Sequence, residues 1–167
     1  MEIAFSLGTN MGDRTANLRD ACTRLAALPA TTITARSRIY ETAPVGVKPQ
    51  YRDMPYLNAV IVIETALPVD QVSDRIHTIE KEMGRVRGGD RFAPRPMDID
   101  ILYAGDLIRD EAALTLPHPR WAQRRFVLQP LADVRPDLLL PGCRQRVSEL
   151  LSALPDAEAV VACDASW

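Results

Sequence analysis

The chain has 167 residues, of which 47% are hydrophobic and 25% are charged, and its formal net charge is −2. These values are typical of one globular domain and exclude a disordered, fibrous or disulfide-rich chain. The longest purely apolar run, residues 59–63, is far shorter than the roughly 20 residues that span a bilayer, and the first residues lack the pattern of a secretory signal. Three scattered cysteines give a disulfide or zinc site little support. We therefore expect one domain over residues 1–167 in a soluble cytoplasmic protein.

The first part of the chain alternates between patterns typical of strands and of helices. Residues 2–7 predict a short strand that enters a glycine-containing turn at residues 8–13. Apolar residues then recur at helical spacing as far as Leu28. The stretch 31–40, rich in threonine and isoleucine, predicts a second strand, and residues 41–55 predict a loop. The opening order is therefore strand, turn, helix, strand.

Another strand, helix and strand follow the loop. The β-branched run at residues 57–65 suits a buried central strand, and apolar residues spaced by three and four from Pro68 to Gly84 predict an amphipathic helix. Residues 97–103 return to a strand. This βαββαβ order predicts an α+β fold, a ferredoxin-like core whose antiparallel sheet is covered by helices. C-terminal additions to the core are expected as a strand or hairpin over residues 106–116 and helices over residues 126–134 and 146–154.

Residues 84–103 carry the most informative pattern, because an arginine-rich loop leads directly into a strand that bears two aspartates. Asp98 and Asp100 are two residues apart, so on a strand their side chains face the same side. Two carboxylates in one cleft repel each other unless a cation binds them, and oxygen ligands favour Mg²⁺. Taken alone, the arginine-rich loop and the strand with two aspartates are each also typical of a solvated surface. The arginines are Arg85, Arg87, Arg91 and Arg95.

Magnesium and several arginines together predict a clamp for a polyphosphate, of which ATP is the obvious one. The chain has neither a Gly-x-x-x-x-Gly-Lys-Ser/Thr loop nor the protein-kinase signature set. Two alternatives remain at this point: another magnesium-dependent nucleotidyl or phosphoryl transferase, and a ferredoxin-like RNA-binding module. The strand at residues 57–65 is aliphatic and the pI is about 5.7, so we expect no nucleic-acid partner.

The chain resembles the 6-hydroxymethyl-7,8-dihydropterin pyrophosphokinase family from its first strand to about Pro141. The signature is the pattern Arg-Pro-x-Asp-x-Asp-Ile-Leu at residues 95–102. The resemblance implies a single pyrophosphokinase domain that transfers the β,γ-diphosphate of ATP to the hydroxymethyl group of the reduced pterin, giving AMP and the pterin diphosphate in folate biosynthesis. The supporting motifs, which match in order, are Gly8-x-Asn10, Tyr40-x-Thr42-x-Pro44-x-Gly46, Tyr56-Leu57-Asn58, Glu80, Gly84-Arg85-x-Arg87, Leu116-Pro117-His118 and Arg124-x-Phe126.

The resemblance gives the arginine loop and the aspartates a role on metal and phosphate. Asp98 and Asp100 would bind two Mg²⁺ ions, and Arg85 and Arg95 would act as catalytic residues on the phosphates. Residues 88–92 would close over the site. Without the resemblance, His118 would as readily be a loop histidine packed between two prolines. The residues implied on the ATP side are Glu80, Arg87, Ile101 through its backbone, Thr115, His118 and Arg124.

For the pterin, the resemblance implies a flat bicycle held between two aromatic rings, with an asparagine amide and backbone groups at its hydrogen-bonding edge. We expect a monomer that acts on these two small-molecule substrates and has no membrane partner. The residues implied for the pterin are Thr42, Pro44, Val45, Tyr56, Asn58 and Phe126. Residues that depart from those common in the family are Ala43, Phe92, Ala113 and Pro119, which stand for a proline, a tryptophan, an arginine and a tyrosine.

Overall fold

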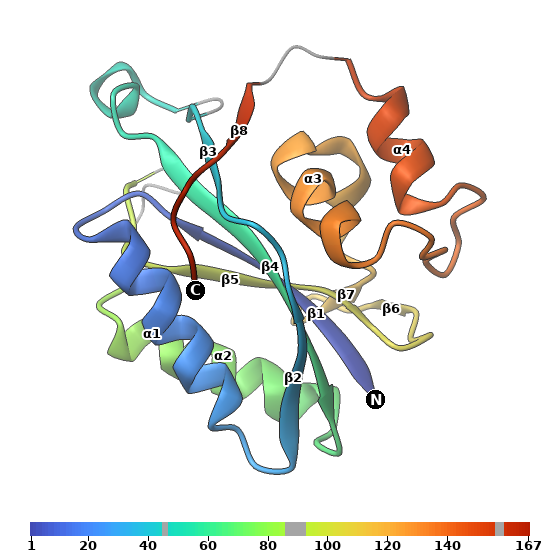
Figure 1. The fold of residues 1–167 in the computed structure, drawn as a ribbon. Helices are drawn as coiled ribbons and strands as arrows, with labels where there is room; N and C mark the ends of the chain where they lie inside the picture. The colour runs from blue at the N-terminus through green and yellow to red at the C-terminus, as the bar shows by residue number, and fades with distance from the viewer. Residues whose placement is uncertain (45–46, 86–92, 156–158) are drawn as a thin grey trace.

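A six-stranded antiparallel sheet with helices on both faces organises the described part of the chain (Figure 1). The computed structural model describes residues 1–44, 47–85, 93–155 and 159–167. The sheet order is β5-β1-β4-β3-β8, and β2 pairs with β4 beside β3. Its strands are β1 (Glu2–Thr9), β2 (Thr31–Arg36), β3 (Tyr40–Thr42), β4 (Tyr56–Thr65), β5 (Asp98–Ala104) and β8 (Val160–Ala162).

Four helices and a small hairpin complete the described elements. The helices α1 and α2 lie against one face of the sheet, whereas α3 and α4 lie on the other face (Figure 1). Single turns of 3-10 helix occupy Pro49–Tyr51 and Trp121–Gln123. The remaining bounds are α1 (Arg14–Ala26), α2 (Val69–Glu82), α3 (Arg125–Val134), α4 (Val147–Ala153), β6 (Arg109–Asp110) and β7 (Thr115–Leu116). No helix of the described residues is long and apolar enough to cross a bilayer.

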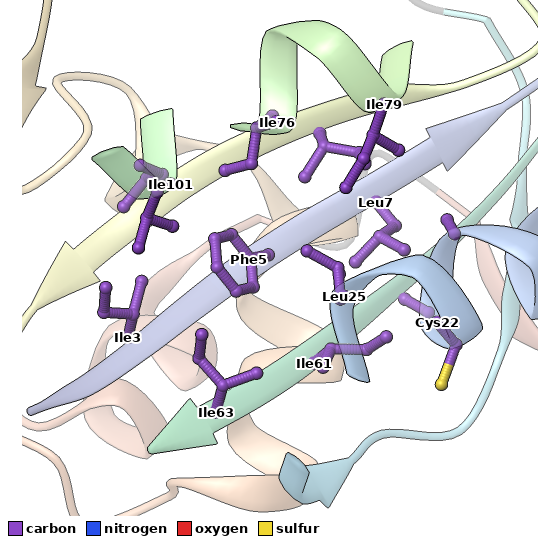
Figure 2. Packing of buried hydrophobic residues seen from close by; sticks show 14 of the residues in the cluster. Ile3, Phe5, Leu7, Cys22, Leu25, Ile61, Ile63, Ile76, Ile79 and Ile101 are labelled. Carbon is purple, nitrogen blue, oxygen red and sulfur yellow. The ribbon is translucent and has the colours of Figure 1, made fainter. Parts of the chain in front are cut away.

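The larger hydrophobic core lies between the sheet and the helices α1 and α2, and Figure 2 shows it from close by. Alternate residues of β1 and β4 enter this core because successive strand side chains point to opposite faces. Helix α1 begins at Asp13, whose carboxylate accepts a hydrogen bond from the Ala16 N–H at 2.9 Å. The core residues that Figure 2 labels are Ile3, Phe5, Leu7, Cys22, Leu25, Ile61, Ile63, Ile76, Ile79 and Ile101.

The second face of the sheet is apolar at one end and polar at the other. Its apolar end, with Val60, Val62 and Leu102, packs in a smaller core with α3 and α4. Because β1 pairs with both β4 and β5, residues of these three strands lie side by side on this face. At its other end the neighbouring residues are polar. Ser6 lies opposite Asp100, and Gly8 lies between Asp98 and Asn58. The polar end of this face forms the floor of the candidate site.

The structure differs from the sequence expectations at the β2–β3 edge. The strand expected over residues 31–40 is two strands, interrupted at residues 37–39. In this interruption the Ser37 N–H donates to the Val60 carbonyl, and the Ser37 hydroxyl accepts from the Val60 N–H. The first two residues of the loop expected over residues 41–55 belong to β3. The C-terminal residues form β8, which pairs with β3 and extends the sheet. Strand pairing of this tail had no local signal in the sequence.

Candidate active site

A pocket of about 790 Å³ opens over the polar end of the sheet. Its volume lies in the range of small-molecule and cofactor sites. The residues expected at the site that line it are Arg85, Arg95, Asp98, Asp100, Glu80, His118, Arg124, Thr42, Tyr56, Asn58 and Phe126. They come from β3, β4, α2 and the residues after it, β5 and the residues before it, and the segment from β7 into the first turn of α3.

The other residues expected at the site either do not line this pocket or lie outside the described residues. Ile101 and Thr115 line a neighbouring hollow of about 220 Å³, which shares His118 with the main pocket. The Ile101 side chain points into the α1–α2 core (Figure 2), so it offers only its backbone. Pro44 does not line the pocket. Val45, Arg87 and the loop 88–92 lie outside the described residues.

Asp98 is held by two arginines. Arg85 Nη1 donates to Asp98 Oδ1 at 2.5 Å, and Arg95 Nη1 donates to Asp98 Oδ2 at 3.0 Å. The three side chains are between 18% and 26% exposed, so they lie within the pocket and not on a solvated face. Without a ligand, the two guanidinium groups therefore balance the charge of Asp98.

Glu80 is a buried carboxylate that supports this cluster from below. It is 2% exposed, it pairs with Arg85, and its Oε1 accepts a hydrogen bond from the Ile99 N–H at 2.9 Å. A buried carboxylate is stable only where charged or hydrogen-bonding partners compensate it. Glu80 thus ties the end of α2 to β5 and orients Arg85.

Asp100 lies on the pocket floor next to Asp98. Burial, together with the negative charges of Asp98 and Glu80, raises the pKa of its carboxyl to about 6, against the opposing effect of Arg124 and Arg85. Its side chain is 45% exposed, and that surface faces the pocket. In the ligand-free pocket, the nearby arginines consequently do not offset the burial and the negative charges that disfavour the ionised form of Asp100.

His118 is neutral at physiological pH. Burial, together with the positive charges of Arg124 and Arg120, lowers the pKa of its imidazole to about 4. Its Nδ1 accepts a hydrogen bond from the Arg120 N–H at 3.2 Å, which places the ring proton on Nε2. Nε2 lies 3.9 Å from Asp100 Oδ2. His118 therefore presents an N–H donor toward Asp100.

The other half of the pocket combines aromatic rings with a buried amide. Asn58 is 4% exposed, and its Nδ2 donates to Thr42 Oγ1 at 2.7 Å. A Cβ atom at Gly8 would lie 3.4 Å from Asn58 Oδ1 and 3.9 Å from a ring carbon of Tyr56. The absence of a side chain at Gly8 therefore keeps the space between the aspartates and Asn58 open. Phe126 borders the same pocket, and its ring centroid lies 5.5 Å from Arg124 Cζ.

The donor set suits magnesium better than a transition metal. Among the described residues, no group of three or more His, Cys, Asp and Glu side chains is placed to hold a metal ion. Mg²⁺ usually binds through one or two carboxylates together with waters and substrate phosphates, so a pair of aspartates is a sufficient protein contribution. The raised pKa of Asp100 points the same way, because a cation would relieve the repulsion that raises it.

Two polar residues with no role predicted from the sequence hold segments of the site in place, although neither lines the pocket. Asn10 and Arg14 hydrogen-bond the segments that carry Arg95 and Tyr56. Asn10 had a signal, because it belongs to the Gly8-x-Asn10 motif. Arg14 had none.

A family model described as 7,8-dihydro-6-hydroxymethylpterin-pyrophosphokinase matches residues 4–136. The chain belongs to this family. Membership confirms the family predicted from the motifs and makes the chain an ATP-dependent diphosphokinase, which transfers a pyrophosphoryl group from ATP to hydroxymethyldihydropterin in folate synthesis. The residues of the family's motifs that line the pocket include Gly8, Thr42, Tyr56, Asn58, Glu80, Gly84, Arg85, Arg95, Asp98, Asp100, His118, Arg124 and Phe126.

Curated relatives are similar over most of the chain. A pyrophosphokinase of this family from Methylorubrum extorquens is 42% identical over 151 residues, which cover 90% of this chain and 91% of the relative. The relative from Pseudomonas aeruginosa is 38% identical over 153 residues, which cover 92% of this chain and 91% of the relative. A mitochondrial folate synthesis bifunctional protein of Arabidopsis thaliana is 41% identical over 133 residues, but the match covers only 23% of that longer protein.

Solved structures agree with the fold. A crystal structure of an HPPK-DHPS protein in complex with substrates superposes with a TM-score of 0.66 at 14% identity, covering 90% of this chain and 43% of that chain. A Plasmodium falciparum HPPK-DHPS structure with pteroate gives a TM-score of 0.67 at 15% identity, covering 90% and 42%. The chain thus spans less than half of these longer proteins. The likeness confirms a mixed fold of an antiparallel sheet and helices.

Proposed function

We propose that the pocket on the polar end of the sheet binds ATP and 6-hydroxymethyl-7,8-dihydropterin together, so that the β,γ-diphosphate passes to the pterin hydroxyl and AMP remains. One observation carries this proposal. Adjacent strands place the carboxylates of Asp98 and Asp100, with their arginines, beside Asn58 and Thr42 across the gap at Gly8. A site for phosphates and a site for a planar heterocycle thus share one floor.

On the phosphate side, Asp98 and Asp100 are our proposed ligands for two Mg²⁺ ions. When bound, Mg²⁺ would neutralise charge on the polyphosphate and polarise its phosphoryl oxygens. Arg85 and Arg95 would then exchange Asp98 for phosphate oxygens, since guanidinium groups bind either partner through charge-assisted hydrogen bonds. In this role both arginines neutralise the diphosphate while it moves.

His118 and Arg124 would complete the phosphate contacts. A neutral imidazole with its proton on Nε2 donates a hydrogen bond, and the lowered pKa of about 4 keeps the ring neutral at physiological pH. His118 is therefore a positioning donor for a phosphate oxygen and not a general base. Asp98 and Asp100 remain the proposed cation ligands of this half of the pocket.

The nucleoside would occupy the neighbouring hollow. This hollow is lined by Ile101 of β5, by Thr115 and by Ala113, and it shares His118 and Asp100 with the lining of the main pocket. Glu80 fits a different role from the one implied by the resemblance. It is 2% exposed and engaged with Arg85 and the Ile99 N–H, so we assign it to positioning Arg85.

The pterin would lie against the aromatic half of the pocket. Tyr56 and Phe126 supply ring faces on which a flat bicycle gains stacking energy. The Asn58 amide, fixed by its bond to Thr42, offers donor and acceptor atoms to the guanidine-like edge of the pterin. Pro44 and Val45 are assigned to the same substrate through their backbone, on the motif match alone.

Within the mixed fold, we propose a ferredoxin-like core with a C-terminal addition. The order β5-β1-β4-β3, with two helices on one face, supports a ferredoxin-like core for the first hundred residues. Contacts of α3 with β4, and of β8 with β3, support one domain over residues 1–167 with the C-terminal part as an addition. We further propose that the protein acts as a monomer, because both substrate halves of the pocket come from one chain.

Incubation of the protein with ATP, Mg²⁺ and 6-hydroxymethyl-7,8-dihydropterin tests the reaction. We expect AMP and the pterin diphosphate to appear in equal amounts, which phosphorus NMR and chromatography measure directly. Release of ADP would indicate a phosphoryl transferase of another kind. Free pyrophosphate, or no turnover with either substrate saturating, would contradict the proposed reaction.

A further inference from the structure

Asn10 is a buried residue that hydrogen-bonds to segments carrying both halves of the pocket. It follows the last residue of β1 and is 5% exposed. Its neighbours in the turn are held by Asn17, whose Nδ2 donates to the Met11 carbonyl at 2.8 Å. A buried amide is stable when its donor and acceptor atoms are paired, so the partners of Asn10 indicate what it holds in place.

One side of Asn10 holds the backbone of Arg95. The Asn10 N–H donates to the Arg95 carbonyl at 3.3 Å, and Asn10 Oδ1 accepts from the Arg95 N–H at 2.9 Å. The two residues are 85 positions apart, so this pair of bonds anchors the middle of the segment 93–97 to the end of β1. Both polar groups of the Arg95 backbone are thereby held in place. The position from which the Arg95 side chain extends into the pocket is therefore fixed.

The other side of Asn10 faces the segment that leads into β4. Asn10 Nδ2 donates to the Met54 carbonyl at 3.5 Å. The bond is long, but Arg14 reinforces the same place, because its Nη1 donates to the Pro55 carbonyl at 2.9 Å and its Nη2 lies 2.8 Å from Glu41 Oε2. The next residue is Tyr56, which lines the pocket.

We propose that Asn10 is a positioning residue that sets the distance between the phosphate half and the pterin half of the active site. The inference rests on the proposed function, in which Arg95 contacts phosphate and Tyr56 contacts the pterin. A transfer between two bound substrates depends on the reacting atoms being aligned, and a displacement of about 1 Å lowers the rate by roughly a hundredfold. Only a side chain with both an acceptor and a donor makes both bonds of Asn10.

Two substitutions separate these bonds, and a third serves as a control. Asn10→Ala removes both side-chain bonds, whereas Asn10→Asp keeps the acceptor for the Arg95 N–H and loses the donor to Met54. Asn17→Ala is the matched control, because Asn17 lies near the same turn and its side chain bonds Thr9 and Met11. The measurements are kcat, the KM of each substrate, the dissociation constant of each substrate alone, and Tm.

We expect Asn10→Ala to lower kcat by roughly a hundredfold. The dissociation constants of a non-hydrolysable ATP analogue and of the pterin, each measured alone, should change far less, because each half-site survives and only their alignment is lost. Asn10→Asp should recover part of kcat, and Asn17→Ala should lower kcat far less than Asn10→Ala does. If Asn10→Ala does not fold, Asn10→Asp decides the question, with an expected kcat clearly below that of the wild type.

A wild-type kcat in Asn10→Ala would overturn the inference. So would an Asn10→Asp variant that is no better than Asn10→Ala, or a loss of kcat that disappears at a temperature where circular dichroism shows the variant fully folded. These results are distinct from failure of the proposed function, in which the wild-type protein itself would produce no pterin diphosphate.

Discussion

Arg95 and Asp98 form an ion pair inside the pocket, with Arg95 Nη1 lying 3.0 Å from Asp98 Oδ2. Arg85 occupies the other oxygen of the same carboxylate. The arginines therefore have two alternative partners, Asp98 in the ligand-free protein and phosphate in the proposed complex. Binding of ATP with a cation would free the arginines for the phosphates, because the cation takes over the charge of Asp98.

Arg95→Ala should lower kcat/KM at least about tenfold, since a charge-assisted hydrogen bond is worth roughly 1.5–3 kcal/mol. Arg95→Lys should recover only part of this loss, because lysine keeps the charge but lacks the planar fork. Steady-state kinetics with ATP varied measure both variants. Arg95 is 20% exposed and paired, so its removal should also lower the free energy of unfolding modestly. Unchanged kinetics in Arg95→Ala would return Arg95 to a purely structural role.

Asp98→Asn and Asp100→Asn should each lower turnover far more than pterin affinity, because each removes a proposed magnesium ligand. Their effects on the ligand-free protein should differ in sign. Asp100→Asn should raise Tm, because the raised pKa shows that its carboxylate is disfavoured there, whereas Asp98→Asn should lower Tm by depriving two arginines of their partner. Kinetics at saturating Mg²⁺ and thermal unfolding measure these outcomes.

Near-normal turnover in either aspartate variant at saturating Mg²⁺ would contradict the two-ion proposal. The Tm comparison is independent of activity, so it tests the charge balance of the ligand-free pocket separately. Equal shifts of Tm in both variants would mean that Asp98 and Asp100 sit in equivalent environments.

Phe126→Ala should weaken pterin binding by roughly 1–3 kcal/mol, the energy of stacking one aromatic face on a planar ring. ATP binding should change little. Separate calorimetric titrations with the pterin and with an ATP analogue measure the two affinities. A variant that lost ATP affinity and kept pterin affinity would place Phe126 in the nucleotide half.

The neutrality of His118 predicts a pH dependence of stability. The folded pKa of about 4 lies below the ordinary value near 6.5, so between these two values the unfolded chain binds more protons than the folded one. Stability from this residue is complete above pH 6.5 and is lost as the pH falls toward 4. His118→Gln should therefore flatten the unfolding free energy across that range.

Denaturant unfolding of the wild type and of His118→Gln at several pH values measures this difference. In the metal-free wild type, imidazole NMR should show a titration midpoint near pH 4 and a proton on Nε2. A midpoint close to 6.5 would contradict the buried, neutral environment.

The C-terminal tail should stabilise the sheet edge. Trp167 Nε1 donates to the Ser37 carbonyl at 2.6 Å, and Arg19 donates to the Ser166 carbonyl at 2.8 Å. Trp167→Ala should therefore lower the free energy of unfolding by about 1–3 kcal/mol, through lost burial and a lost hydrogen bond. Val161→Ala is the control, because Val161 is 61% exposed on the same tail and should have little effect. Equal stability of both variants in urea would show that the tail does not brace the edge.

The sequence by itself determined the features that depend on local geometry. The two-residue period of a strand placed Asp98 and Asp100 on one face and their isoleucine neighbours in the core, and the structure agrees. The three-and-four spacing after Pro68 gave the helix that ends beside Arg85. The motif matches gave the family, since the residue types and their order are written in the chain.

Only the tertiary structure decided what those residues touch. Strand pairing, which depends on contacts far apart in sequence, set Asp98 beside Gly8 and Asn58. Packing of α2 against β5 buried Glu80 beside Arg85, where a sequence pattern shows merely a charged helix residue. The pKa of His118 and the bridge from Asn10 to Arg95 arise from burial and from bonds across 85 residues, and no local spacing encodes either. A period fixes the face on which a side chain lies, whereas its partners are fixed only when distant segments pack together.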